Sequence, residues 1–191
     1  MELKKLVNFI KEQDPSVKST AEIFLYQGFW AIVFHKIAHS FYKHKWFFLA
    51  RFISQIARFI TLIEIHPGAQ VATEVFIDHG TGVVIGETAI VGRRTVIFHG
   101  VTLGGTGKDT GKRHPTVGEN VIIGANASIL GPIIIGDSAK IGAGAVVLSD
   151  VEPFTTIVPE VARNINCEHS LRYDIELMRK RLEQIEKEKK C

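Results

Sequence analysis

The stretch VGENVIIGANASILGPIIIGDSAKIGAGAVV, residues Val117–Val147, repeats every six residues. Val or Ile opens each hexad, the fifth position is usually small or β-branched, and Gly often fills the second. Six residues are too few for a pair of helices, so each unit can supply only one short strand and a turn. A fixed short period of this kind indicates a solenoid. Three such sides close a coil of about 18 residues, and coils stack at strand spacing, about 4.8 Å.

The same frame extends towards the N-terminus and predicts which residues point into the coil. Its openings are Ile65, Val71, Ile77, Val83, Ala89, Thr95 and Val101, and then Val117, Ile123, Ile129, Ile135, Ile141 and Val147. Counting in sixes from Val101 gives 107, but the frame resumes at Val117, so ten residues are inserted. Gly104–Pro115, GGTGKDTGKRHP, is therefore predicted to leave the coil as a positively charged loop. Loops carried by a rigid scaffold often bear function.

These hexads resemble the left-handed parallel β-helix of the hexapeptide-repeat acyltransferases. The six-residue period does not itself specify a handedness. The resemblance implies that the coil is left-handed, whereas connections between parallel strands are usually right-handed. A parallel β-helix of another kind is the alternative.

Composition limits the class of protein. The chain has 191 residues, of which 46% are hydrophobic and 23% charged, as in soluble globular proteins. Its net charge is only +3 and its basic residues are dispersed, which argues against nucleic-acid binding. The N-terminus lacks a signal-peptide core, and no apolar run reaches the roughly 18 to 20 residues of a membrane span. Cys167 and Cys191 suggest neither a disulfide framework nor a metal site, so we expect a cytoplasmic protein without a metal.

Glycine and phenylalanine divide the chain. Sixteen of the 17 glycines lie between Gly68 and Gly144, whereas nine of the 12 phenylalanines precede residue 60. We predict an α-helical domain over 1–63, a β-helix over 64–157, and a tail over 158–191. Asp14-Pro15 is a helix-start signal, and apolar residues recur at helical spacing over 23–41 and 46–63. The aromatic side chains are expected to pack the helices on each other and on a neighbouring subunit; a membrane-surface helix is the alternative.

The tail is charged and is expected to be helical from about residue 167. Leu171, Ile175, Met178, Leu182 and Ile185 are spaced 4, 3, 4, 3, a seam two heptads long. A trimeric coiled coil and a helix packed on its own subunit both fit this spacing.

Four stretches resemble serine acetyltransferases in particular. They are the helical DPSV (Asp14–Val17), EIHPGA (Glu64–Ala69), IDHGTGVVIGETA (Ile77–Ala89), and GVTLGGTGK with KRHP (Gly100–Lys108 and Lys112–Pro115). The resemblance covers nearly everything from residue 13 to about 157. It implies transfer of an acetyl group from acetyl-CoA to the hydroxyl of L-serine, as a step of cysteine biosynthesis.

His79 is the expected catalytic base. Acetyl transfer from a thioester to a hydroxyl needs a base for the hydroxyl proton and donors for the developing oxyanion. A carboxylate is also needed to orient the imidazole. Adding one coil of 18 residues to Glu64 gives 82, three residues from His79, so we expect Glu64 to supply that carboxylate. We expect direct attack without an acyl-enzyme, with a backbone N–H of the Gly104-Gly105 turn facing the oxyanion.

The remaining site residues follow from the resemblance. Positions matching amino-acid ligands are Asp14, Asp78, Glu87, Arg113 and His114, with carboxylates for the ammonium group and Arg with His for the carboxylate. Positions matching the groove for the CoA pantetheine and phosphates are Gly105, Gly124, Ala125 and Lys140.

The resemblance also implies an assembly. The family's active site lies between neighbouring β-helices of a homotrimer, and the helical segment resembles the part that joins two trimers into a hexamer. Cysteine is an expected feedback inhibitor at the serine site. Family members that bind O-acetylserine sulfhydrylase use a C-terminal Ile, whereas this sequence ends in Cys191, so that complex is not expected. The segment VPEVARN, Val158–Asn164, replaces the family's usual GVPAR-type turn.

Other functions remain as alternatives. A γ-type carbonic anhydrase uses the same solenoid with three histidines between subunits, and His79, His99 and His114 could be compared with them. The His-x4-His spacing of that class is absent, and Glu64 and Arg113 would have no role in it. A non-catalytic scaffold would leave the charged loop unexplained. Homoserine or a sugar is the nearest alternative acceptor, but Asp14, Asp78 and Arg113 favour a small zwitterion.

Overall fold

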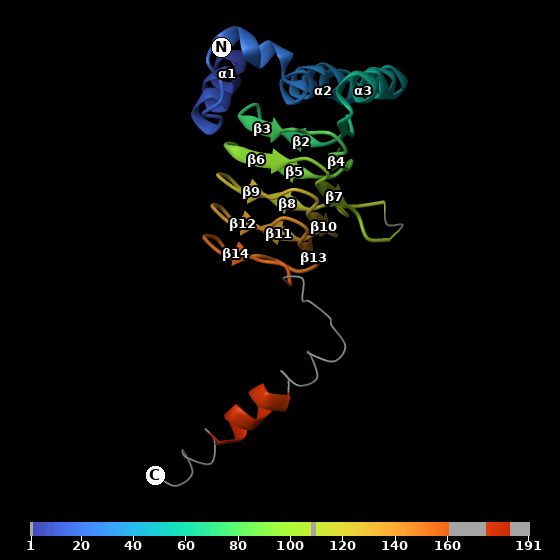
Figure 1. Cartoon of the computed structure of the whole chain (residues 1–191). Coiled ribbons are helices and arrows are strands. Elements are labelled where there is room, and N and C mark those ends of the chain that lie inside the picture. The colour runs from blue at the N-terminus through green and yellow to red at the C-terminus, as the bar shows by residue number, and fades with distance from the viewer. Residues whose placement is uncertain (1, 108–109, 161–174, 184–191) are drawn as a thin grey trace. The chain divides into compact units, whose positions relative to one another are not determined.

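The computed structural model describes residues 2–107, 110–160 and 175–183. The chain divides into two compact units, residues 1–159 and 160–191. Helices and a stack of coils make up the first unit, with the helices at one end of the stack (Figure 1). The expected fold class, N-terminal helices followed by a parallel β-helix with one protruding loop, is confirmed.

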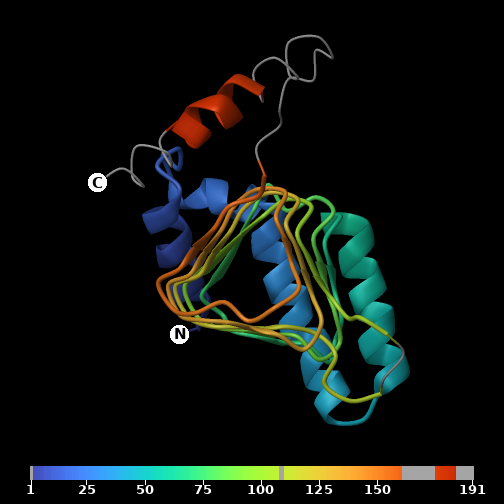
Figure 2. The same ribbon diagram turned by 90° about the horizontal axis from the view of Figure 1, so that it is seen from below.

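In the part of the chain that the structure describes, fourteen short strands form three parallel sheets that enclose a triangular core (Figure 2). The first sheet contains β1 (Glu64–Ile65), β4 (Val84–Ile85), β7 (Thr102–Gly104), β10 (Ser128–Leu130) and β13 (Val146–Val147). The second contains β2 (Gln70–Val71), β5 (Ile90–Val91), β8 (Thr116–Val117) and β11 (Ile134–Ile135). The third contains β3 (Val75–Asp78), β6 (Thr95–Phe98), β9 (Ile122–Ile123), β12 (Lys140–Ile141) and β14 (Thr156–Ile157). Each strand pairs with the strand one coil away, so the repeat is built as the hexads predict.

Columns of aliphatic side chains hold the coils together. In the first sheet, the paired residues Ile65, Ile85, Leu103, Ile129 and Val147 are all buried. Full burial of one such side chain stabilises the fold by about 1.5–3 kcal/mol. The small residues of the fifth position, such as Ala127 and Ala139, are also fully buried, because they pack where the strands bend at the corners.

The predicted frame was wrong between Val83 and Val101. Ile65 pairs with Ile85, a step of 20 residues, and Ile85 pairs with Leu103, a step of 18. Two extra residues therefore lie in the turn between β3 and β4, and the inward openings that follow are Ile85, Val91, Ile97 and Leu103. The predicted openings Val83, Ala89, Thr95 and Val101 are buried fifth-position residues instead. Only eight residues are inserted in the loop, since Val91 pairs with Val117 over 26.

The helices cover one end of the β-helix. They are α1 (Glu2–Gln13), a 3₁₀ segment η1 (Thr20–Leu25), α2 (Gln27–Lys43) and α3 (Phe47–Thr61). Leu6, Ile10, Phe29 and Ile32 belong to the same buried cluster as the coil residues. The expected helix start at Asp14-Pro15 was wrong: α1 ends at Gln13, and the Asp14 carboxylate accepts the Ser16 N–H in a turn instead.

The second unit contains one described helix, residues 175–183, whose side chains are exposed. Cys167, Leu171, Ile185 and Cys191 lie outside the described residues, whereas the predicted seam residues Ile175, Met178 and Leu182 lie on this helix and are exposed. Within the described parts of the chain, none of the helices has the length and hydrophobicity that crossing a membrane requires.

Candidate functional site

The two extra residues of the first coil form a turn that carries His79. Its backbone is left-handed, with φ of 52°, and the Thr81 N–H donates to the His79 carbonyl. Other non-glycine residues at the corners of this β-helix, such as Arg94 and Asn126, are also left-handed, so the conformation by itself indicates a tight turn. The His79 side chain is 80% exposed, so the turn lifts an imidazole clear of the coil.

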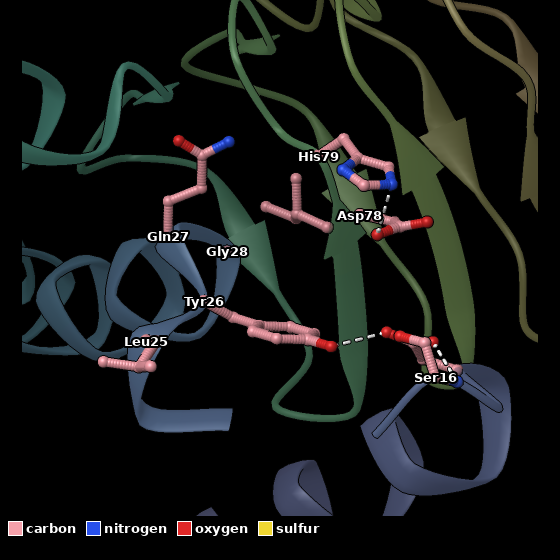
Figure 3. A pocket seen from close by; sticks show the side chains of 9 residues that line it. Ser16, Leu25, Tyr26, Gln27, Gly28, Asp78 and His79 are labelled. Carbon is pink, nitrogen blue, oxygen red and sulfur yellow. Dashed lines mark hydrogen bonds and ion pairs between the residues drawn. The ribbon is translucent and has the colours of Figure 1, made fainter. Parts of the chain in front are cut away.

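A cavity of about 520 Å³ lies beside this turn (Figure 3). Asp78 and His79 form one wall, and Asp14, Ser16 and Tyr26, from the connections between α1, η1 and α2, form another. The Tyr26 hydroxyl donates to Asp14 Oδ2 at 2.6 Å, and the Ser16 N–H donates to Oδ1 at 2.8 Å. The structure thus brings together three predicted site residues from distant parts of the sequence: Asp14, Asp78 and His79.

The two carboxylates in this cavity differ electrostatically. The hydrogen bond from Tyr26, followed by that from Ser16, lowers the pKa of Asp14. Burial raises the pKa of Asp78, and the neighbouring His79 partly opposes this shift. His79 Nε2 lies 3.7 Å from Asp78 Oδ1. The cavity therefore offers an imidazole and two acidic groups, a combination suited to a cationic ammonium beside a hydroxyl.

Glu64 lies elsewhere on the same corner of the prism. It pairs with Val84, which is five residues beyond His79 and not three, because of the two extra residues in the turn. Its carboxylate forms ion pairs with two arginines of α3, Arg58 at 3.3 Å and Arg51 at 3.8 Å. Among the described residues, no hydrogen bond or ion pair joins Glu64 to His79. The imidazole has Asp78 as its carboxylate neighbour in this chain.

The other residues predicted to bind the amino-acid substrate form a second cluster, at the corner between the first and second sheets. Arg113 Nη2 donates to Glu87 Oε2 at 2.6 Å, and the Tyr42 hydroxyl of α2 donates to Glu87 Oε1 at 3.0 Å. The pKa of Glu87 is lowered, chiefly by the hydrogen bond from Arg113. His114 is 8% exposed, and burial, followed by the charge of Arg113, lowers its pKa. Within one chain, this cluster lies on a different corner from His79.

The residues predicted for the CoA groove follow the His79 corner along the axis of the β-helix. Asp78 pairs with Phe98, and Ile97 pairs with Ile123, so Gly124 and Ala125 continue the line of Asp78 and His79 two coils away. That separation is about 10 Å at strand spacing. A Cβ at Gly124 would lie 2.6 Å from the Ala143 nitrogen, so only glycine fits there. Lys140 is exposed on β12, which pairs with β9 in the third sheet. Gly105 lies in the loop beside Arg113.

The corner that carries His79 holds a second histidine one coil away. His79 and His99 occupy equivalent positions on successive coils, because Asp78 pairs with Phe98. Over residues 2–107, 110–160 and 175–183, no three His, Cys, Asp or Glu side chains gather in a way that could hold a metal ion.

Sequence reasoning missed three polar residues of these clusters. Tyr26 and Tyr42 lie in the aromatic-rich helices and were treated only as packing residues, although each hydroxyl bonds a candidate site carboxylate. Thr88 makes several hydrogen bonds to residues 112–114. Its position beside Glu87, one coil and the loop insertion before KRHP, was the available signal.

Known proteins resemble this chain in sequence and in fold. The family model described as "Bacterial transferase hexapeptide (six repeats)" matches residues 114–149. The serine acetyltransferase of Bacillus subtilis is 54% identical over 157 residues, which are 82% of this chain and 72% of that protein. The solved serine acetyltransferase of Neisseria gonorrhoeae in complex with serine superposes with a TM-score of 0.80 at 44% identity, over 85% of this chain and 67% of that one. The Brucella abortus enzyme in complex with coenzyme A gives a TM-score of 0.79 at 41% identity, over 84% of this chain and 65% of that one.

The three-sided coil and the matching family model define the class, a hexapeptide-repeat transferase. The identity of 54% across 82% of the chain narrows the class further. The chain belongs to the serine acetyltransferase family.

Proposed function

We propose that this protein transfers the acetyl group of acetyl-CoA to the hydroxyl of L-serine and so forms O-acetylserine for cysteine biosynthesis. The observation that carries the proposal is the exposed imidazole of His79 in a cavity that also holds the carboxylates of Asp14 and Asp78. A small zwitterionic alcohol needs acidic partners for its ammonium group and a base beside its hydroxyl. The complexes of family members with serine and with coenzyme A support the same pair of substrates.

In the proposed mechanism, both substrates are bound together. His79 takes the proton of the serine hydroxyl, and the oxygen attacks the acetyl carbonyl directly. A backbone N–H of the Gly104-Gly105 turn stabilises the oxyanion. As the intermediate collapses, the C–S bond breaks, and the CoA thiolate takes the proton from the imidazolium. No residue is acylated, so each turnover returns His79 to its neutral form.

Two carboxylates near the turn are candidates for supporting the imidazolium. Asp78 is close to His79 in the single chain, whereas Glu64 is paired with Arg58 and Arg51. We propose that Glu64 supports His79 once it leaves these arginines, and that Asp78 binds the ammonium group. Glu64→Gln should then lower kcat by roughly 10² or more with little change in the KM for serine, and Asp78→Asn should mainly raise that KM. The reverse pattern would exchange the two roles.

We propose that two copies of the chain complete one acceptor site. Asp14, Asp78 and His79 lie at one corner of the prism, while Glu87, Arg113 and His114 lie at another. A zwitterion needs both groups within a few ångströms, so the Arg113 corner of one subunit should face the His79 corner of its neighbour. A homotrimer satisfies this condition with three identical interfaces; a hexamer of two trimers would leave the sites unchanged.

Acetyl-CoA is proposed to lie along the His79 corner. Gly124 and Ala125 let its extended pantetheine approach the backbone, and Lys140 is a candidate for its phosphates. Cysteine has the charged groups of serine with a thiol in place of the hydroxyl. We therefore expect it to compete with serine at the same site.

An acceptor screen tests this proposal. Purified protein and acetyl-CoA are mixed with L-serine, L-homoserine, a sugar or no acceptor, and release of free CoA thiol is followed. Serine should give by far the largest kcat/KM, with O-acetylserine identified by mass spectrometry. Thiol release that requires homoserine or a sugar would replace the proposed acceptor, and no acceptor-dependent release would refute the transferase reaction.

A further inference from the structure

Thr88 stands at the centre of the second cluster, and we infer that it is a positioning residue for acceptor binding. It fixes the path of residues 112–114 and determines which nitrogen of His114 carries the proton. The inference rests on the proposed function, in which Arg113 and His114 bind the serine carboxylate.

One threonine holds three consecutive loop residues. Its Oγ1 accepts the backbone N–H groups of Arg113 and His114, both at 3.1 Å. Its carbonyl oxygen accepts Lys112 Nζ at 2.7 Å, and the same ammonium donates to the Pro115 carbonyl at 3.2 Å. The end of the loop is therefore attached to the neighbouring coil through the backbone and the hydroxyl of Thr88.

The same residue selects the tautomer of His114. The Thr88 N–H, which can only donate, points to His114 Nδ1 at 3.2 Å. Thr88 Oγ1 lies 2.9 Å from the same nitrogen, and its hydrogen is available to it because both N–H contacts use the oxygen as an acceptor. Nδ1 therefore carries no proton, and the neutral ring must carry its proton on Nε2. Burial and the Arg113 charge lower the pKa of His114, which keeps the ring neutral near pH 7.

The two residues before Thr88 also contact residues 112–114. A Cβ at Gly86 would overlap Cδ2 and Nε2 of His114, so glycine makes room for the ring. Glu87 holds the Arg113 guanidinium at 2.6 Å. Each residue of Gly86-Glu87-Thr88 thus acts on the side chain or backbone of Lys112-Arg113-His114.

A fixed donor matters for binding a carboxylate. The Nε2–H of His114 and the guanidinium of Arg113 can act together only if their backbone is held and the proton is on Nε2. Without the Thr88 hydroxyl, two part-buried backbone N–H groups lose their acceptor, and Nδ1 of His114 loses one of its two donors. Acceptor binding should suffer more than binding of acetyl-CoA.

Thr88→Val tests the inference, because valine keeps the shape of the side chain and removes the hydroxyl. Thr88→Ser should restore the hydroxyl. Thr95→Val is the matched control, since Thr95 is a fully buried coil threonine whose hydroxyl bonds the Gly118 carbonyl. We expect Thr88→Val to raise the KM for serine roughly ten- to hundredfold, as for two lost hydrogen bonds. The KM for acetyl-CoA should change by less, Thr88→Ser should recover most of the loss, and Thr95→Val should leave both constants near the wild-type values.

Two measurements on the protein without substrates keep this test separate from the proposed function. Hydrogen exchange should show protected amides at Arg113 and His114 in the wild type and faster exchange in Thr88→Val. The ¹⁵N NMR spectrum of His114 should show an unprotonated Nδ1 in the wild type. The role of Thr88 would be overturned by unprotected Arg113 and His114 amides or by a protonated Nδ1 of His114 in the wild type. It would also be overturned if Thr88→Val and Thr95→Val raised the KM for serine and the KM for acetyl-CoA equally. If the wild type fails to acetylate serine while the amides and the tautomer behave as expected, the proposed function fails and the positioning role stands.

Discussion

His79 shows how a single residue gains its role from backbone geometry. Its left-handed φ of 52° places the imidazole outside the coil, next to Asp78. Sequence reasoning identified this histidine from the DHGTG motif. The strained conformation could not be predicted, because it depends on two extra residues that the hexad count had assigned to a later loop.

Replacing His79 should stop the chemistry and leave the scaffold intact. Asn tolerates left-handed backbone well, so His79→Asn removes the base with little strain. We expect kcat to fall by about 10³ or more, within the range that general-base catalysis allows together with lost orientation. Acetyl-CoA affinity, measured by calorimetry, and the melting temperature should stay close to the wild-type values.

His99 provides the control for this variant. It occupies the equivalent position one coil away and lies outside the cavity. His99→Asn should keep near-normal kcat. Near-normal turnover in His79→Asn would remove the proposed base.

His35 makes a separate prediction about stability. It is 4% exposed, and burial lowers its pKa to about 3; the nearby His39 adds to this effect. Its Nδ1 has no hydrogen-bond partner among the described residues. The unfolded chain takes up a proton below pH 6.5, whereas the folded chain stays neutral until about pH 3. The free energy of unfolding should therefore fall as the pH decreases between these values, by up to about 1.4 kcal/mol per pH unit from this residue.

Urea unfolding at several pH values checks this slope. In His35→Gln the dependence between pH 6.5 and pH 4 should be shallower than in the wild type. His44→Gln, which replaces an exposed histidine directly after the end of α2, is the control substitution. Equal slopes in all three proteins would show that His35 does not titrate in this way.

At the scale of elements, the hexads predicted the type of coil and the existence of the loop. They could not locate the insertions, because fifth-position residues such as Val83 and Ala89 are as apolar as the openings. A shift of two residues therefore leaves the hydrophobic pattern nearly unchanged. The aromatic helices were also predicted, but Asp14-Pro15 lies between the end of α1 at Gln13 and the start of η1 at Thr20 and begins no helix.

Close stacking of the coils can be tested at Gly92. A Cβ at this position would overlap the carbonyl group of Gly118 in the adjacent coil, and backbone cannot move aside cheaply. Gly92→Ala should lower the free energy of unfolding by about 1–3 kcal/mol, as judged by chemical denaturation. Gly111→Ala, where no atom lies within 4 Å, should change it by much less. Equal stabilities would mean that the coils can separate to admit a methyl group.

At the scale of the whole molecule, the two clusters on different corners make the assembly testable by complementation. His79→Asn and Arg113→Ala should each be nearly inactive alone. Co-expressed in equal amounts, they should form mixed trimers in which about a quarter of the interfaces join an intact His79 corner to an intact Arg113 corner. Activity should therefore return to roughly a quarter of the wild-type value.

A second pair of variants controls for nonspecific rescue. His79→Asn and Asp78→Asn damage the same corner, so every interface in their mixed trimers keeps a defect. At a serine concentration well below the KM of Asp78→Asn, that pair should show no more activity than Asp78→Asn alone. Recovery in both mixtures, or in neither once mass spectrometry has shown mixed trimers, would contradict a shared site.

The turn that follows β3 is the first place where the described β-helix departs from its six-residue count. Deleting its two extra residues would make the coils more uniform. His79 would then lie in a shorter turn, like that of the next coil, and its imidazole would no longer be held clear of the coil. For this architecture, sequences closest to a perfect hexad consensus are therefore poor guides to activity. The residues that say most about activity lie where the six-residue repeat is interrupted.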